Sequence, residues 1–161
     1  MPPVIELRRE FYPEQDRYHP IASSVTDLDW TNAVTVKDRP VLIVAEGLLM
    51  YLADTDVKRL FLRLREAFTG CRLIADVFSR MTARSATKHP SLRQIGASLG
   101  WGIDDLREVE GWAQGIHLLE EWHFTQDPDL NRLNLGYRLA YKLVGSFNMV
   151  RRAHRIVYYQ L

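Results

Sequence analysis

Residues 39–78 decide the fold class, and they read RPVLIVAEGLLMYLADTDVKRLFLRLREAFTGCRLIADVF. The segment 41–45 is apolar and rich in β-branched residues, which is typical of a strand buried on both faces, and 72–78 (RLIADVF) predicts a second buried strand. Between them, Asp54 and Asp56 place negative charge where a helix begins, and apolar residues recur at helical spacing up to Phe68. This order predicts a βαβ unit, with a helix over 55–68 and two parallel strands.

The rest of the chain continues the alternation of helices and strands. The patterns predict two late strands, over 116–124 and 154–161. They also predict further helices over 3–11, 91–99, 104–113 and 135–143. In the helix 3–11, the apolar residues Val4, Leu7 and Phe11 share one face, which needs a cover. We therefore expect residues 1–161 to form one α/β domain with a mostly parallel, doubly wound sheet.

The composition narrows the classes of partner. The chain has 161 residues, 47% of them hydrophobic, and a formal net charge of +1. This balance argues against a dedicated nucleic-acid binder, which carries clustered positive charge. The most apolar run, 41–53, contains Glu46 and falls short of a membrane span, so we expect no membrane partner. Cys71 is the only cysteine, so no internal disulfide forms and a cytoplasmic location is expected.

Two acidic residues stand where an α/β sheet usually binds its ligands. Asp27 follows a short apolar stretch, and Glu46 follows the strand 41–45 and precedes Gly47. Ligands of open α/β sheets bind outside the carboxyl ends of the strands, and glycine lets a backbone come close to a ligand. Each acid can accept hydrogen bonds from a ribose, an adenine amino group or a cationic ligand. The alternative is structural: Asp27 caps a turn, and Glu46 pairs with an arginine.

Four segments together resemble one protein family. Residues 23–30 read SSVTDLDW, residues 44–52 read VAEGLLMYL, residues 3–9 read PVIELRR and residues 101–106 read WGIDDL. They resemble the leucine carboxyl methyltransferase-like family, class I S-adenosylmethionine-dependent O-methyltransferases that include bacterial enzymes of the polyketide type. The Ala-Glu-Gly-x-x-x-Tyr-Leu motif is the most specific piece, and the resemblance covers nearly all of 3–124.

The resemblance implies a role for each matching residue. Asp27 and Leu28 match the pair that faces the adenine of S-adenosylmethionine. Glu46, followed by Gly47, matches the acid that reaches toward the sugar and methionine side of this cofactor. Tyr51 lies where the substrate pocket of the family begins, although a tyrosine packed with its hydroxyl at the surface fits equally well. The implied reaction is methyl transfer to a carboxylate or hydroxyl oxygen of a small molecule. No catalytic base can be named, and the histidines do not have metal-ligand spacing.

The resemblance also implies a Rossmann-like sheet with the strand order 3-2-1-4-5-7-6, in which the two late strands pair antiparallel beside the fifth. In that order, 18–22 is a short third strand, 41–45 is the fourth and 72–78 is the fifth. The glycine loop after the first strand has no counterpart here. The segment Gly100-Trp101-Gly102 follows no predicted strand and lacks the third glycine. We therefore expect Met1 to be an internal start or a boundary, with the first two strands and the ribose-binding acid missing.

Three functional hypotheses follow. The first is an O-methyltransferase domain that is crippled in this form, with weak or absent S-adenosylmethionine binding. The second is an inactive fragment that self-associates or binds a partner, because the strand 41–45 would present a bare apolar edge and could join two chains in a homodimer. The third is an unrelated α/β binding protein.

Overall fold

The computed structural model describes residues 2–35, 39–87, 90, 94, 96–124, 132 and 134–161. Four strands form one open sheet in the order β1-β2-β4-β3. Their bounds are β1 Leu42–Ala45, β2 Arg72–Phe78, β3 His117–His123 and β4 His154–Gln160. The helices are α1 Pro2–Phe11, α2 Trp30–Ala33, η1 Leu49–Tyr51, α3 Asp54–Ala67, α4 Arg80–Ala86, η2 Leu106–Trp112, α6 Leu135–Gly145 and α7 Asn148–Arg151. None of the helices in these described ranges has the length and apolar character needed to span a bilayer.

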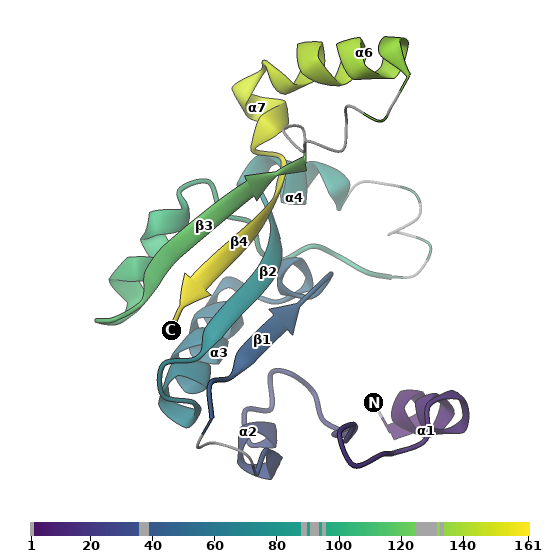
Figure 1. The fold of residues 1–161 in the computed structure, drawn as a ribbon, viewed down its shortest axis with the longest axis vertical. Coiled ribbons are helices and arrows are strands. Elements are labelled where there is room, and N and C mark those ends of the chain that lie inside the picture. Colours follow the sequence, from purple (N-terminus) through teal and green to yellow (C-terminus); the bar gives the residue numbers. More distant parts are fainter. Residues whose placement is uncertain are drawn as a thin grey trace.

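The predicted βαβ unit is confirmed. Strands β1 and β2 are parallel, in a register that runs from Leu42 opposite Arg72 to Ala45 opposite Ala75. Helix α3 connects them and lies against one face of the sheet (Figure 1). Its apolar stripe, which includes Phe61 and Leu64, is buried in the core shared with the sheet. The crossover places the carboxyl ends of β1 and β2 side by side, which is the edge where α/β folds bind ligands.

The two late strands are also confirmed, as an antiparallel pair beside β2. Strand β4 lies in the middle and pairs antiparallel with both β2 and β3. The order β1-β2-β4-β3 therefore corresponds to strands four, five, seven and six of the order implied by the resemblance. The predicted partial Rossmann-like α/β sheet with a C-terminal antiparallel pair is confirmed, and among the four described strands one pairing is parallel and two are antiparallel.

Several predicted elements differ from the structure. The segment 18–22 is not a strand, because Tyr18 forms only an isolated bridge with Gln15 and no described strand pairs with the segment. The segment 104–113 contains the 3-10 helix η2 rather than an α-helix. Most of the predicted helix 91–99 lies outside the described residues. The predicted helices 3–11 and 135–143 correspond to α1 and α6.

One face of the sheet carries no covering layer among the described elements. Leu42 and Val44 are 57% and 66% exposed, so the prediction that β1 is buried on both faces was wrong. They lie on the face opposite α3, and β1 is also an edge strand. Helix α1 is set apart from the sheet in Figure 1, and its apolar residues, such as Leu7 and Phe11, remain exposed. The expected cover for this stripe is therefore not found within the described chain.

A tightly packed segment joins the sheet to η1 and α4. The backbone N–H groups of Gly100 and Trp101 both donate to the Met50 carbonyl, at 2.8 and 3.2 Å, and Trp101 is buried. A Cβ on Gly100 would lie 2.4 Å from the Leu52 carbonyl oxygen, and one on Gly102 would lie 2.9 Å from the Ser79 carbonyl oxygen. These two glycines therefore serve close backbone packing, in agreement with their rejection as a cofactor loop.

Candidate cofactor-binding edge

The turn after β1 exposes an acid at the carboxyl edge of the sheet. Ala45 is buried at the end of β1, whereas Glu46 and Gly47 are exposed. Gly47 has a φ of +60°, in the left-handed region that glycine adopts without strain. A Cβ at this position would meet no atom within 4 Å, so the backbone angle rather than crowding requires glycine here. The turn therefore leaves open space above its backbone.

Asp76 fixes this turn from the neighbouring strand. The Gly47 N–H donates to Asp76 Oδ1 at 2.7 Å. The other carboxylate oxygen, Oδ2, lies 3.0 Å from Nε2 of His154 at the start of β4. The side chains of Asp76 and His154 are 14% and 39% exposed. One carboxylate thus links the ends of three strands that lie side by side in the sheet.

A hollow of about 270 Å³ opens beside this carboxylate. Its floor is apolar and includes Val44, Ile74 and Ile156, one residue from each of three adjacent strands. Its polar groups come from Glu46, Asp76 and His154, and Phe124 completes the lining with Ala45 and Ala75. The His154 ring lies 4.6 Å from the Phe124 ring and 4.7 Å from the Phe78 ring, measured between centroids. The hollow therefore combines an apolar floor with one acid and one acid–imidazole pair.

The turn that contains Asp27 is held by a different set of contacts. Leu28 packs against the core, and Thr31, in α2, is fully buried. Arg63 of α3 donates from Nε to Thr31 Oγ1 at 2.9 Å and from Nη2 to Asn32 Oδ1 at 2.6 Å. Asp27 itself is exposed. Across the described ranges, no hydrogen bond joins the Asp27 turn directly to Glu46 or Gly47.

Both predicted acids are available to a ligand. In the described part of the chain, neither Asp27 nor Glu46 takes part in an ion pair or a side-chain hydrogen bond. The structural alternatives, a cap for Asp27 and an arginine partner for Glu46, are therefore not seen. Carboxylates of this kind can accept hydrogen bonds from hydroxyl and amino groups, such as those of an adenosine. Glu46, Gly47, Asp27 and Leu28 are the residues that could hold it.

Tyr51 lies in η1, after the buried residues Leu49 and Met50, and its side chain is 47% exposed. The hydrogen bonds from Gly100 and Trp101 to Met50 fix the backbone beside it. This position is compatible with contact to a substrate and with a surface tyrosine, so both interpretations of Tyr51 stand.

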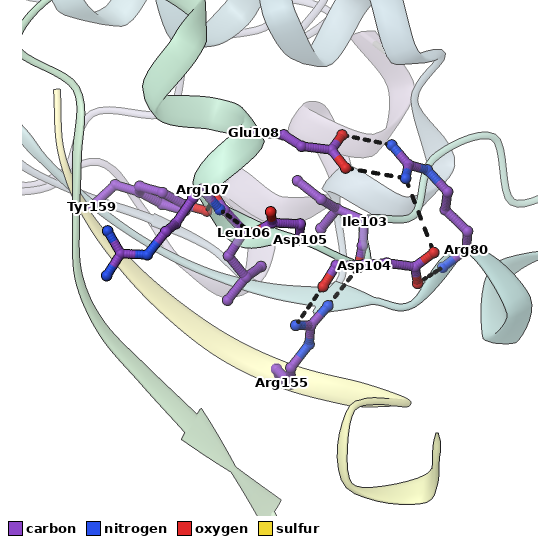
Figure 2. Close-up of polar contacts among 9 residues, drawn as sticks. All are labelled: Arg80, Ile103, Asp104, Asp105, Leu106, Arg107, Glu108, Arg155 and Tyr159. Atoms are coloured by element: carbon purple, nitrogen blue, oxygen red, sulfur yellow. Dashed lines mark hydrogen bonds and ion pairs between the residues drawn. The ribbon is translucent and has the colours of Figure 1, made fainter. Parts of the chain in front are cut away.

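A polar network fixes the loop that faces the start of α4 (Figure 2). Arg155, which is 1% exposed, donates to the carbonyl oxygens of Ile103 and Asp104. Asp104 Oδ1 accepts from the backbone N–H of Arg80 at 3.1 Å, and the Arg80 guanidinium binds Glu108 with both terminal nitrogens. This network anchors the chain directly after the carboxyl end of β2.

Asp76 and His154 are the site residues that the sequence analysis missed. Asp76 is a charged residue within the apolar part of β2, near the carboxyl end of the strand, and the argument made for Glu46 applies to it equally. His154 offers no such signal, because it lies 78 residues further along the chain. Only the antiparallel register of β2 and β4, with Phe78 opposite His154, brings the two side chains together.

Comparison with known proteins gives two relatives and several similar structures. The tetracenomycin polyketide synthesis O-methyltransferase TcmP of Streptomyces glaucescens is 38% identical over 164 residues, covering 99% of this chain and 58% of that protein. The S-adenosyl-L-methionine-dependent methyltransferase dpfgK of Gibberella zeae is 28% identical over 137 residues, covering 77% of this chain and 45% of that protein. The chain thus spans about half the length of these relatives. No protein-family model matches it.

Solved structures agree on the fold. A DUF574 family protein from Streptomyces avermitilis superposes with a TM-score of 0.61 at 11% identity, covering 99% of this chain and 62% of that one. A SAM-dependent methyltransferase from Anabaena variabilis gives a TM-score of 0.57 at 9% identity, covering 97% and 63%. At these identities the likeness concerns the fold alone. It agrees with the partial Rossmann-like sheet expected from the sequence.

Proposed function

Because this chain is a relative of S-adenosylmethionine-dependent O-methyltransferases of the leucine carboxyl methyltransferase-like type, we propose that it forms the adenosine-binding part of such an enzyme. The proposed reaction is methyl transfer to a carboxylate or hydroxyl oxygen of a small molecule. The observation that carries the proposal is the unpaired Glu46 carboxylate on the open Gly47 turn, at the carboxyl end of a parallel strand.

We assign roles to the predicted residues on this basis. Asp27 and Leu28 contact the adenine, and Glu46 with Gly47 contacts the sugar and methionine side. Tyr51 contacts the acceptor molecule. When bound, S-adenosylmethionine supplies the activated methyl group, and the protein contributes mainly by holding the acceptor oxygen in line with it. The cytoplasm is the proposed location, since Cys71 is a free thiol.

We further propose that the chain alone binds the cofactor weakly. Its 161 residues contain no Gly-x-Gly-x-x-Gly loop. Such a loop, with an acid for the ribose, would contribute several hydrogen bonds, some of them to charged groups. Losing them costs roughly 3–6 kcal/mol, which corresponds to a loss of affinity on the order of a hundred- to ten-thousand-fold. We therefore expect detectable binding only at high ligand concentration, unless another polypeptide segment supplies the loop.

Amide NMR with S-adenosylhomocysteine, the stable product of the reaction, tests the proposal. We expect fast-exchange shifts at Gly47 and in the 25–29 turn, with millimolar affinity. Glu46→Ala should remove the Gly47 shifts, whereas Glu66→Ala, at an exposed position on α3, should leave them unchanged. Shifts confined to other parts of the chain, or equal shifts in the Glu46→Ala variant, would overturn the assignment. Tight micromolar binding would show that the glycine loop is dispensable.

A second candidate function is self-association or partner binding without catalysis. The observation in its favour is that β1 is an edge strand whose outward residues, Leu42 and Val44, are more than half exposed. Unpaired edges of this kind tend to add another strand. In a homodimer, β1 of one copy would pair with β1 of the other around a two-fold axis.

A further inference from the structure

The pair formed by Asp76 and His154 has a fixed arrangement of hydrogens. A carboxylate oxygen only accepts hydrogen bonds, so the His154 nitrogen that faces Asp76, Nε2, must carry the hydrogen. In a neutral imidazole the other nitrogen, Nδ1, then has a free lone pair. The Phe78 and Phe124 rings lie against the imidazole and restrict its orientation. Nδ1 of His154 can therefore accept a proton, and Asp76 holds the ring in the tautomer that this requires.

The surroundings of this pair suit a molecule with an apolar body and one polar end. The hollow is floored by Val44, Ile74 and Ile156, and its polar groups are Glu46 and the hydrogen-bonded pair of Asp76 and His154. The same Asp76 carboxylate accepts from the Gly47 N–H, so it also holds the turn that carries Glu46. The Gly47 turn, which is the proposed cofactor site, and the hollow therefore share Asp76.

We propose that His154 is the proton acceptor for a hydroxyl-bearing apolar acceptor molecule, with Asp76 as its positioning residue. The methyl-transfer step that follows rests on the proposed function. The acceptor hydroxyl loses its proton to His154 Nδ1. The oxygen uses the freed electron pair to bond the methyl carbon, whose bond to the donor sulfur breaks with its electron pair left on sulfur.

The tautomer of His154 gives a test that needs no methyl donor. Long-range proton–nitrogen NMR, at a pH where the ring is neutral, should show hydrogen on Nε2 and none on Nδ1. In Asp76→Asn, the amide oxygen must stay with the Gly47 N–H, so its NH₂ group faces Nε2. The hydrogen should then move to Nδ1, the nitrogen that must be bare to act as a base. Asp56→Asn, at a half-buried acid paired with Arg59, should leave the tautomer unchanged.

A pair of small probes tests whether the hollow recognises a hydroxyl. We expect 2-naphthol to move the His154 Nδ1 resonance and to bind about fivefold more weakly to His154→Gln, the effect of losing one hydrogen bond. Its methyl ether, 2-methoxynaphthalene, lacks the donated proton and should bind both forms equally. His19→Gln, at an exposed histidine near the N-terminus, serves as the matched control.

Three results would overturn the inference: a hydrogen on Nδ1 in the wild-type protein, an unchanged tautomer in Asp76→Asn, or equal 2-naphthol affinity in His154→Gln. The wild-type tautomer requires no variant, so a misfolded variant cannot hide the answer. If S-adenosylhomocysteine fails to contact Glu46 while the tautomer and probe results hold, the methyltransferase proposal fails and the proton-accepting pair remains. The two failures are therefore distinguishable.

Discussion

At the scale of single residues, Gly100 and Gly102 are the positions with the least room for change. A methyl group on Gly100 would lie 2.4 Å from the Leu52 carbonyl oxygen, and one on Gly102 would lie within 3.0 Å of the Arg80 backbone. We expect Gly100→Ala and Gly102→Ala each to lower the free energy of unfolding by about 1–3 kcal/mol, because backbone must move to make space. Urea denaturation measures this change.

Gly111→Ala is the control, because a Cβ there would meet nothing within 4 Å and the residue is exposed. Its effect should stay within about 0.5 kcal/mol. If Gly100→Ala were as stable as Gly111→Ala, the close packing of the 100–102 segment against η1 would be wrong.

The sequence predicted the candidate site unevenly at this scale. Glu46 could be found because it ends an apolar run before a glycine, and both features are local. Asp76 carried the same local signal but lies within its strand, two residues before the strand ends at Phe78. His154 could not be found, since its role depends on a register between strands that are distant in sequence. Local chemistry is visible in a sequence, whereas long-range pairing requires the fold.

At the scale of elements, strand β1 is the part most open to new contacts. Val44 is 66% exposed and lies on the uncovered face, at the edge of the sheet. If β1 joins two copies, Val44→Lys should shift the chain toward monomer, because charged residues on edge strands oppose strand addition. Light scattering over a dilution series measures the mass.

The matched control is Val4→Lys, at an exposed apolar position on α1 away from β1. It should leave a β1-mediated dimer intact. A wild-type protein that is monomeric at every concentration would contradict the dimer, and equal dissociation by both substitutions would place the contact elsewhere.

Most elements could be predicted because their patterns are strong and local. The helix α3 has an apolar stripe between an acidic first turn and Gly70, and its bounds differ from the prediction by one residue at each end. The segment 18–22 failed as a strand because an apolar sequence forms a strand only when a neighbour offers hydrogen bonds. The segment 104–113 became the 3-10 helix η2, and its loop is held by tertiary contacts such as Tyr159 Oη to the Leu106 carbonyl.

At the scale of the whole molecule, Cys71 reports whether the chain folds by itself. The residue has no exposed surface, and burial raises the pKa of its thiol. Because the raised pKa lowers the thiolate fraction in the folded state at any given pH, native protein should react slowly with a thiol reagent at mildly alkaline pH. Unfolding in guanidinium should make the reaction fast. Rapid and complete reaction in native buffer would show that the core is open in this chain.

The position of β4 has a consequence for how the chain folds during its synthesis. Of the four described strands it is translated last, yet it lies between β2 and β3, which do not pair with each other. Until residues 154–160 are available, β3 has no strand to bind, and β2 has only β1. This four-stranded sheet therefore closes last at its centre, and such long-range closure is slow and leaves apolar strands open to wrong partners in the interval.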